Sequence, residues 1–274
     1  MRDWLGRMQN IDRRWIFLAI FLAVLLPFVT NLKLPVGEPS PATRALYDHI
    51  EQLPEGSVIV ISCDYSPSSM PELEPMAKAI VRHALQHNIR VVAMTLHPQG
   101  ALMIDRIFDE VAPQVGAEYG EDYVVAGFKP GGLAVILGMG RDIPKVFGFT
   151  DARGNELSEL PAMEGVNTYD DVAVLVDFAA NNLPQSWVAY AHERYDLTVA
   201  AGVTGVMATD LYPFWKSGQL LAVVNGLKGA AEYEHLVGEP GWGLLGMSSQ
   251  SIAHALIILF VIFGNVGYFL TRRS

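Results

Sequence analysis

The sequence of 274 residues contains one cysteine, Cys63, no cluster of basic residues and no strong catalytic motif. A lone cysteine cannot form a disulfide within the chain, so a folded domain must be stabilised by its hydrophobic core. The formal net charge of −10 at pH 7, with lysine and arginine dispersed, argues against nucleic acid or anionic lipid as a binding partner. No cofactor-binding motif is present either. We therefore expect no bound cofactor, and the sequence identifies no catalytic residue.

Long apolar runs lie near both ends of the chain. They cover residues 15–36 and 251–270 and contain few polar side chains. A helix needs about 20 mostly apolar residues to cross the hydrocarbon core of a bilayer. We therefore predict two transmembrane helices in contact with the lipid bilayer, with a globular domain between them.

Arginines flank these runs on the sides that face the chain termini. They are Arg2, Arg7, Arg13 and Arg14 before the first run, and Arg272 and Arg273 after the second. Basic residues close to a span are retained in the cytoplasm, whereas long loops cross largely regardless of charge. We therefore predict a cell-membrane (inner-membrane) protein with cytoplasmic termini and a periplasmic or extracellular domain. A cleaved signal peptide is the alternative for the first run, but no small-x-small cleavage site follows it.

The segment between the two runs contains an approximate internal repeat. Residues 63–72 (CDYSPSSMPE) align with residues 176–185 (VDFAANNLPQ), and each stretch places an aspartate before a proline at the same spacing. Two further matches follow in the same order, Gly100 with Gly205 and Gly127 with Gly226. We interpret the three ordered matches as an internal duplication.

Each half of the repeat reads as strand and helix in alternation. The strand runs are short, apolar and β-branched, at residues 58–61, 91–96, 123–126, 172–176, 198–201 and 220–224. Continuous apolarity is typical of parallel strands that are covered on both faces. Two βαβαβ halves resemble the Rossmann-type architecture, with strand order 3-2-1-4-5-6. The predicted fold is therefore an α/β domain with a doubly wound, mostly parallel, six-stranded Rossmann-like sheet built from duplicated halves, flanked by the transmembrane helices.

The resemblance concerns architecture only. The phosphate-binding fingerprint GxGxxG is missing after the first strand, where DYSPSS stands, so we predict no dinucleotide site. The helix that follows should begin near Pro71, because proline is tolerated in a first turn. Ser69 and Glu72 fit a capping box at the same helix start.

The predicted boundaries follow from these patterns. They are residues 1–14 and 271–274 for the cytoplasmic ends, 15–36 and 251–270 for the spans, 37–56 for a linker and entry helix, 57–140 and 171–238 for the two α/β halves, and 239–250 for a second linker. The remaining segment, residues 141–170, connects the halves and is long and polar. We interpret it as a lid, a hairpin or an interaction loop.

Polar residues collect where the predicted strands end. They are Cys63, Asp64, His97, Asp177, Thr204 and Asn225. Ligands of open α/β sheets bind beyond the carboxyl ends of the strands, so these residues are the ligand-binding candidates. In the predicted strand order Asp64 and Asp177 face each other, where they can bind a divalent cation or share a proton. The alternative is structural, since an aspartate after a strand often caps a helix or forms a turn.

Two further arrangements have weaker support. Cys63 with His97 and an aspartate lists the parts of a thiol nucleophile and its base, but an unpaired cysteine is more often buried in a core. His83 and His87 have the i, i+4 spacing of a helical metal site, although the glutamate of HExxH is absent from HALQH. An ordinary helix surface is the alternative for this pair.

In the second span, Gly264, Asn265 and Gly267 form a small and polar patch. Such residues let helices approach closely, so we expect packing against the first span or a partner subunit. The leading functional hypothesis is a non-enzymatic binding or assembly subunit of a membrane complex, with membrane protein subunits as its partners. The alternatives are a hydrolase or metal-dependent enzyme that uses Asp64 and Asp177, and a solute-sensing accessory of a transporter that binds a small molecule.

Overall fold

The computed structural model describes residues 12–272. Arg2, Arg7 and Arg273, which the topology prediction uses, therefore lie outside the described residues. The described residues form two compact units, one made of residues 12–35 with 244–272 and the other of residues 36–243.

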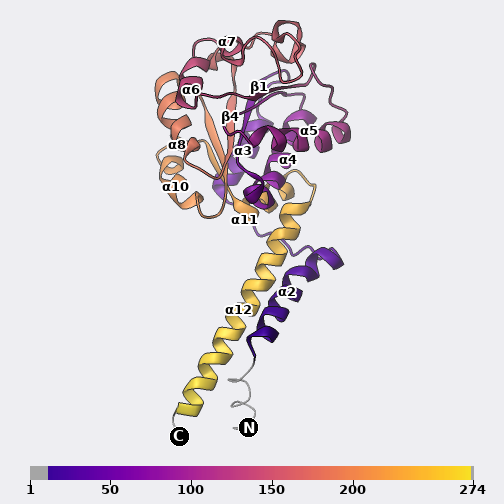
Figure 1. Cartoon of the computed structure of the whole chain (residues 1–274), viewed down its shortest axis with the longest axis vertical. Coiled ribbons are helices and arrows are strands. Elements are labelled where there is room, and N and C mark those ends of the chain that lie inside the picture. Colours follow the sequence, from indigo (N-terminus) through magenta and orange to yellow (C-terminus); the bar gives the residue numbers. More distant parts are fainter. Residues whose placement is uncertain (1–11, 273–274) are drawn as a thin grey trace. The chain divides into compact units, whose positions relative to one another are not determined.

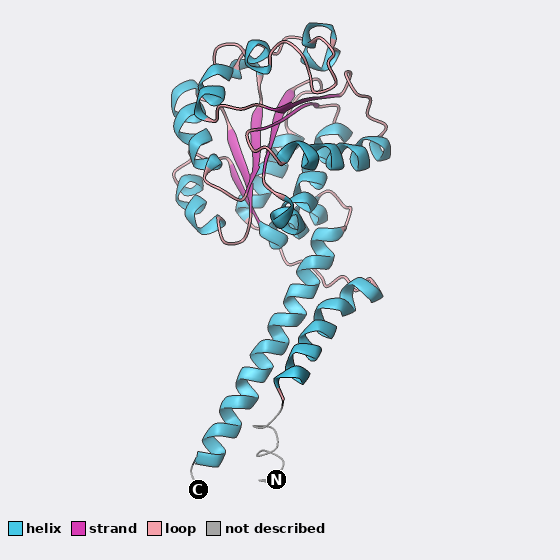
Figure 2. Ribbon diagram, in the orientation of Figure 1, coloured by secondary structure: helices cyan, strands magenta, loops and turns pink. Residues whose placement is uncertain are grey.

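The larger unit is built around a six-stranded sheet with the order β3-β2-β1-β4-β5-β6 (Figures 1 and 2). Every neighbouring pair is parallel. The strands are β1 (Val58–Asp64), β2 (Arg90–Thr95), β3 (Tyr123–Phe128), β4 (Val174–Ala179), β5 (Val199–Val203) and β6 (Ala222–Asn225). The predicted Rossmann-like order is confirmed, and β1 and β4 are the central neighbours at which the winding direction reverses.

Helices cover both faces of this sheet, which explains why the strands are apolar along their whole length. One face carries α3 (Pro41–Glu51), α4 (Met70–Gln86), α5 (Gly100–Val115) and α11 (Gly226–Leu236). The other carries α6 (Leu133–Met139), α7 (Ile143–Phe147), α8 (Leu183–Trp187) and α10 (Ala208–Lys216). Figure 1 shows α3, α4 and α5 on one side and α6, α8 and α10 on the other. A π-helical segment (Val188–His192) and α9 (Glu193–Tyr195) follow α8.

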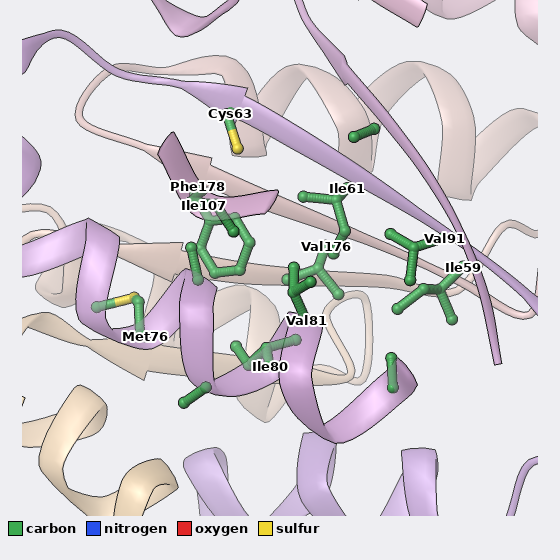
Figure 3. Close-up of a cluster of buried hydrophobic side chains, with 14 of the residues drawn as sticks. Ile59, Ile61, Cys63, Met76, Ile80, Val81, Val91, Ile107, Val176 and Phe178 are labelled. Atoms are coloured by element: carbon green, nitrogen blue, oxygen red, sulfur yellow. The ribbon is translucent and has the colours of Figure 1, made fainter. Parts of the chain in front are cut away.

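Alternate residues of each strand enter the two cores. Ile59, Ile61 and Cys63 point toward α4 and α5, where they meet Phe178 and Met76 (Figure 3). The intervening residues of β1 therefore point to the opposite face, toward α6, α8 and α10. This alternation decides which polar side chains of the strand ends can meet.

The start of α4 differs from the prediction. Pro71 lies in the first turn as expected, but the Ser69 side chain makes no capping hydrogen bond. Glu72 instead accepts a hydrogen bond from the backbone N–H of Gly205, at 2.8 Å. The capping box is therefore wrong, because a tertiary contact with the loop after β5 takes the glutamate that the box would have used.

The segment that joins the halves is packed against the sheet. Leu157, Met163 and Tyr169 are buried in the core on the α6 face. Asp151 organises a tight turn by accepting hydrogen bonds from the backbone of Arg153 and Asn155, both at 2.8 Å. The predicted polar connection thus also contains apolar residues, and these help to cover the face of the sheet on which α6 lies.

The smaller unit consists of α2 (Arg13–Thr30) and most of α12 (Trp242–Arg272). The helices pair through hydrogen bonds from the Ser249 hydroxyl to the Val24 carbonyl, at 3.0 Å, and from the Leu34 N–H to the Ser248 hydroxyl, at 2.9 Å. Both are long and apolar enough to cross a membrane, by length and composition.

Both helix boundaries differ from the predicted spans. α2 ends at Thr30 rather than residue 36, because Asn31 adopts a left-handed conformation and closes the helix. α12 is continuous from Trp242, so most of the predicted linker over residues 239–250 is helical. A glycine costs a helix only about 1 kcal/mol. Gly243 is also suited to its position, since a Cβ there would lie 2.9 Å from the Ala230 side chain.

Candidate functional site

The carboxyl ends of the central strands bring Asp64 and Asp177 together. Asp177 on β4 is in register with Ser62 on β1, and Asp64 lies two residues further along the same face of β1. Both aspartates are 0% exposed to solvent. The structure therefore places the two carboxyl groups on neighbouring strands, beneath the surface of the sheet edge.

Asp64 is held by hydrogen bonds from its own chain. Its Oδ1 accepts from the Leu96 N–H at 2.5 Å, and its Oδ2 accepts from the Ser62 hydroxyl at 2.6 Å. The Thr95 hydroxyl lies 3.1 Å from the same Oδ1. A buried carboxylate is tolerated when donors surround it in this way, so Asp64 is the member of the pair that carries the negative charge.

Asp177 has the opposite environment. Within the described chain, neither of its carboxyl oxygens has a hydrogen-bond partner of ordinary geometry. Complete burial raises the pKa of Asp177 well above its usual value, and the neighbouring Asp64 charge raises the pKa further. Burial therefore favours the protonated form of Asp177, and in that form the carboxyl can donate to the neighbouring Asp64. The close pair thus holds one proton and one charge.

The other predicted site residues lie along the same edge of the sheet. His97 follows β2 and is half-buried, with its Nδ1 3.3 Å from the Gln99 N–H. Thr204 follows β5, and its carbonyl accepts from Met207 at 3.0 Å. Asn225 is the last residue of β6, and its side chain donates to the Tyr212 hydroxyl at 3.2 Å. Each residue stabilises its own loop or a neighbouring helix in the structure.

Cys63 is separated from this group by the alternation of the strand. Its side chain lies on the opposite face of the sheet among apolar residues, and it is 0% exposed (Figure 3). Burial raises the pKa of the Cys63 thiol well above its usual value, and the negative charge of the nearby Asp64 raises it further. The thiolate is therefore disfavoured, and the structure does not bring this thiol together with His97 as a nucleophile and base.

Sequence reasoning missed three residues that organise the aspartates. Ser62 and Thr95 supply hydroxyls to Asp64, and the Asn181 side chain donates to the Asp64 backbone carbonyl at 2.7 Å. A polar residue within an otherwise apolar strand was the available signal for Ser62 and Thr95. Asn181 carried no signal, since its partner lies 117 positions away in the sequence.

Exposed apolar side chains line the same edge of the sheet. They are Leu102 (59% exposed), Phe128 (37%), Leu133 (42%) and Val206 (84%): Leu102, Leu133 and Val206 follow β2, β3 and β5, and Phe128 is the last residue of β3. We call them the edge residues. Local contacts fix the chain next to two of them: beside Val206, Gly205 is bound by Glu72, and near Leu102, a Cβ on Gly100 would lie 2.0 Å from the Cys63 carbonyl oxygen. Only glycine allows this close approach of the loop to β1.

In the small and polar patch of α12, the space beside Gly264 is open. A Cβ on Gly264 would meet nothing within 4 Å among the described residues. The Asn265 side chain donates to the Val261 carbonyl of its own helix, at 2.9 Å. Nearer the start of α12, Ser249 donates to Val24 of α2, and Ser248 accepts from Leu34 in the segment after α2. Packing of Gly264, Asn265 and Gly267 against the first span or a partner subunit stays a prediction.

A groove of about 740 Å³ lies on the connecting segment, away from the aspartates, and Phe149, Glu156, Leu160 and Asn167 are among its lining residues. Its walls mix apolar and acidic side chains and contain no cluster that indicates a particular ligand.

Comparisons with models of protein families, with curated proteins and with solved structures find no match for this chain.

Proposed function

We propose that the chain is a membrane-anchored, non-enzymatic binding or assembly subunit. The observation that carries this proposal is the exposure of the four large apolar edge residues at or after the carboxyl ends of β2, β3 and β5, with the chain beside two of them fixed by local contacts. Large apolar side chains that stay exposed at one edge of a domain typically mark a surface for another protein. Loops held in one conformation lose little entropy on binding, which favours association.

The buried aspartates favour this function over the enzymatic alternative. A hydrolase or metal-dependent enzyme would need at least one carboxyl to reach a substrate or a metal-bound water. Asp64 and Asp177 are both fully buried, and Asp64 is engaged by the chain's own donors. Their arrangement matches a structural carboxyl pair that joins the central strands.

The edge residues give a direct test with a matched control. Leu102→Asp and Val206→Asp should each reduce recovery of partner subunits at least about fivefold, because a charge at an interface core costs more than about 1 kcal/mol. The measurement is quantitative mass spectrometry of proteins that co-purify with the tagged full-length chain from membranes in mild detergent. Phe149→Asp is the control, because Phe149 is 60% exposed, as Leu102 is at 59%, but lies on the connecting segment.

A specific loss in the two edge variants supports the proposed surface. Equal losses in all three variants would show a general effect of added charge. No stoichiometric partner in the native preparation would also contradict the assembly function.

We further propose that α2 and α12 span the membrane, with the α/β domain outside the cytoplasm. Their apolar side chains are mostly exposed within the chain, unlike those of a helix in a soluble core. Arg13 and Arg14 begin α2, and Arg272 ends α12, on the sides that the topology rule retains in the cytoplasm.

Cysteine labelling should reveal this topology, because the native Cys63 is buried and gives little background. In Val206→Cys, the new thiol replaces a side chain that is 84% exposed. A membrane-impermeant maleimide should label it in intact spheroplasts. A cysteine appended after Ser274 should react only after permeabilisation. The reverse pattern would place the domain in the cytoplasm.

The proposal of an internal duplication is supported by the matching elements of the two halves. Gly100 is the first residue of the helix after the second strand of its half, and Gly205 lies just before the helix in the corresponding place of the other half. Gly127 and Gly226 lie at the end of the third strand or directly after it, and both have positive φ angles, 80° and 51°. The same backbone requirement at corresponding positions is expected of duplicated halves.

A further inference from the structure

A second polar cluster lies at the opposite edge of the sheet from the aspartates. Glu51 is the last residue of α3, His83 lies in the last turn of α4, and His87 is the C-cap of α4. Among the described residues, this is the group of three in which one ligand atom from each side chain lies within 4.8 Å of the others. The sequence showed the two histidines at i, i+4 spacing but gave no sign that Glu51 joins them.

The distances in this cluster fit a metal ion. The Glu51 Oε1 lies 3.0 Å from His83 Nε2 and 3.4 Å from His87 Nε2. Bonds of about 2.0–2.1 Å in tetrahedral geometry place zinc ligand atoms about 3.3 Å apart. Glu51 is thus spaced from each histidine as a neighbouring ligand of one ion would be, and the ligand atoms of the two histidines lie within 4.8 Å of each other.

The hydrogen bonds behind the ligands orient both imidazole rings. The Nδ1 of His87 lies 3.0 Å from the His83 backbone carbonyl, which can only accept, so this nitrogen carries the proton. The Nε2 of His87 therefore faces the Glu51 carboxylate, where both atoms can ligate the same cation. The Nδ1 of His83 lies 2.9 Å from the Tyr233 hydroxyl. Support of this kind behind each ligating histidine is typical of protein metal sites.

The surroundings favour a cation and leave it accessible. α3 and α4 both end at the cluster, so the negative ends of two helix dipoles point toward it. Arg82, the basic neighbour on α4, is paired with Glu239 at 3.1 Å. The side chains of Glu51 and His87 are each 38% exposed, which provides a route from solvent.

We propose that Glu51, His83 and His87 bind one divalent transition-metal ion, zinc by ligand type and spacing, with a fourth coordination position open to solvent. Two imidazoles and one carboxylate are a ligand set that zinc uses when it keeps a water or another group in its fourth position. The site ties the end of α3 to the end of α4 and is independent of the edge residues.

The test is metal binding by the full-length chain, purified in detergent and stripped with a chelator. Titration with Co²⁺ should reach one equivalent per chain and produce the visible absorption bands of a tetrahedral ion, and Zn²⁺ should displace it. Glu51→Gln and His87→Ala should each weaken binding by more than about 100-fold, since they remove a ligand. These two positions are partly exposed, so neither variant should unfold the chain.

Two additional variants sharpen the result. Tyr233→Phe keeps the ring and removes the hydroxyl behind His83, so binding should weaken about 10–100-fold. His235→Ala, at an exposed position of α11, is the matched control and should bind as the native chain does. Substoichiometric binding, or equal affinity in Glu51→Gln, His87→Ala and the native chain, would overturn the proposal. A loss of binding in His235→Ala as large as that in His87→Ala would overturn it as well.

Discussion

The stability of the native chain relative to an Asp177→Asn variant should fall by about 1.4 kcal/mol for each pH unit above about pH 4. The physical reason is the buried carboxyl of Asp177, whose pKa is raised well above its usual value in the folded state. In the unfolded chain this group loses its proton near pH 4, whereas the folded chain retains it. Folding therefore takes up a proton, and that uptake becomes less favourable as the pH rises.

The sign and the window follow from this difference. Below the unfolded-state pKa both states hold the proton, so the contribution of Asp177 is fully present. Above it the contribution decreases until the pH reaches the raised folded-state pKa. Within this window the loss accumulates at about 1.4 kcal/mol for each pH unit.

The comparison with Asp177→Asn is needed because another buried group acts in the opposite direction. Burial lowers the pKa of His83 to about 4. Its contribution to stability therefore increases with pH between about 4 and 6.5. Urea unfolding of both proteins in mild detergent, followed by tryptophan fluorescence at several pH values, isolates the Asp177 contribution as a difference. A difference that does not change with pH would show that Asp177 is ionised in the folded chain.

The second large effect concerns Asp64. Asp64→Ala should lower the free energy of unfolding by about 3–5 kcal/mol at neutral pH, because a buried charged acceptor is lost while its donors remain. The Leu96 N–H and the Ser62 hydroxyl both donate to this carboxylate. The substitution also removes the carboxylate to which the protonated Asp177 can donate a hydrogen bond.

The two aspartates should therefore respond unequally, although they look alike in the sequence. Asp177→Asn replaces a neutral carboxyl by a neutral amide of the same shape, so at neutral pH it should cost far less than Asp64→Ala or should stabilise the chain. The measurement is the same urea unfolding at pH 7. A cost below about 1 kcal/mol for Asp64→Ala would contradict the assigned hydrogen bonds. A greater loss in Asp177→Asn than in Asp64→Ala would reverse the assignment of the proton.

Most of the fold could be predicted because its signals are local. Short β-branched runs alternate with amphipathic stretches, and such a pattern leaves few topologies open for a parallel sheet. The errors lie where a tertiary contact outweighed a local rule. Glu72 binds Gly205 instead of completing the capping box of α4. α12 continues through a stretch that looked like a linker.

The candidate sites depended far more on packing. The sequence placed Asp64 and Asp177 at strand ends. That one carboxyl is charged and the other neutral depends on hydrogen-bond donors, such as the Leu96 N–H, which reach Asp64 and not Asp177. Burial is a property of the assembled layers, and no feature of the local sequence shows that both carboxyls are inaccessible. The position of Cys63 also depended on the structure. Alternation places its side chain on the opposite face of the sheet from Asp64, but only once the bounds of β1 show that both residues belong to the strand.

The sequence by itself determined the α/β class, the strand order and the presence of two long apolar helices, because these depend on periodicity and on runs within short windows. Only the tertiary structure decided which polar groups meet. Glu51 lies 32 positions from His83, yet the ends of α3 and α4 bring the two side chains within 3.0 Å. Contacts of this kind depend on how helices pack across a sheet, and that geometry is set by the volumes of many core side chains together.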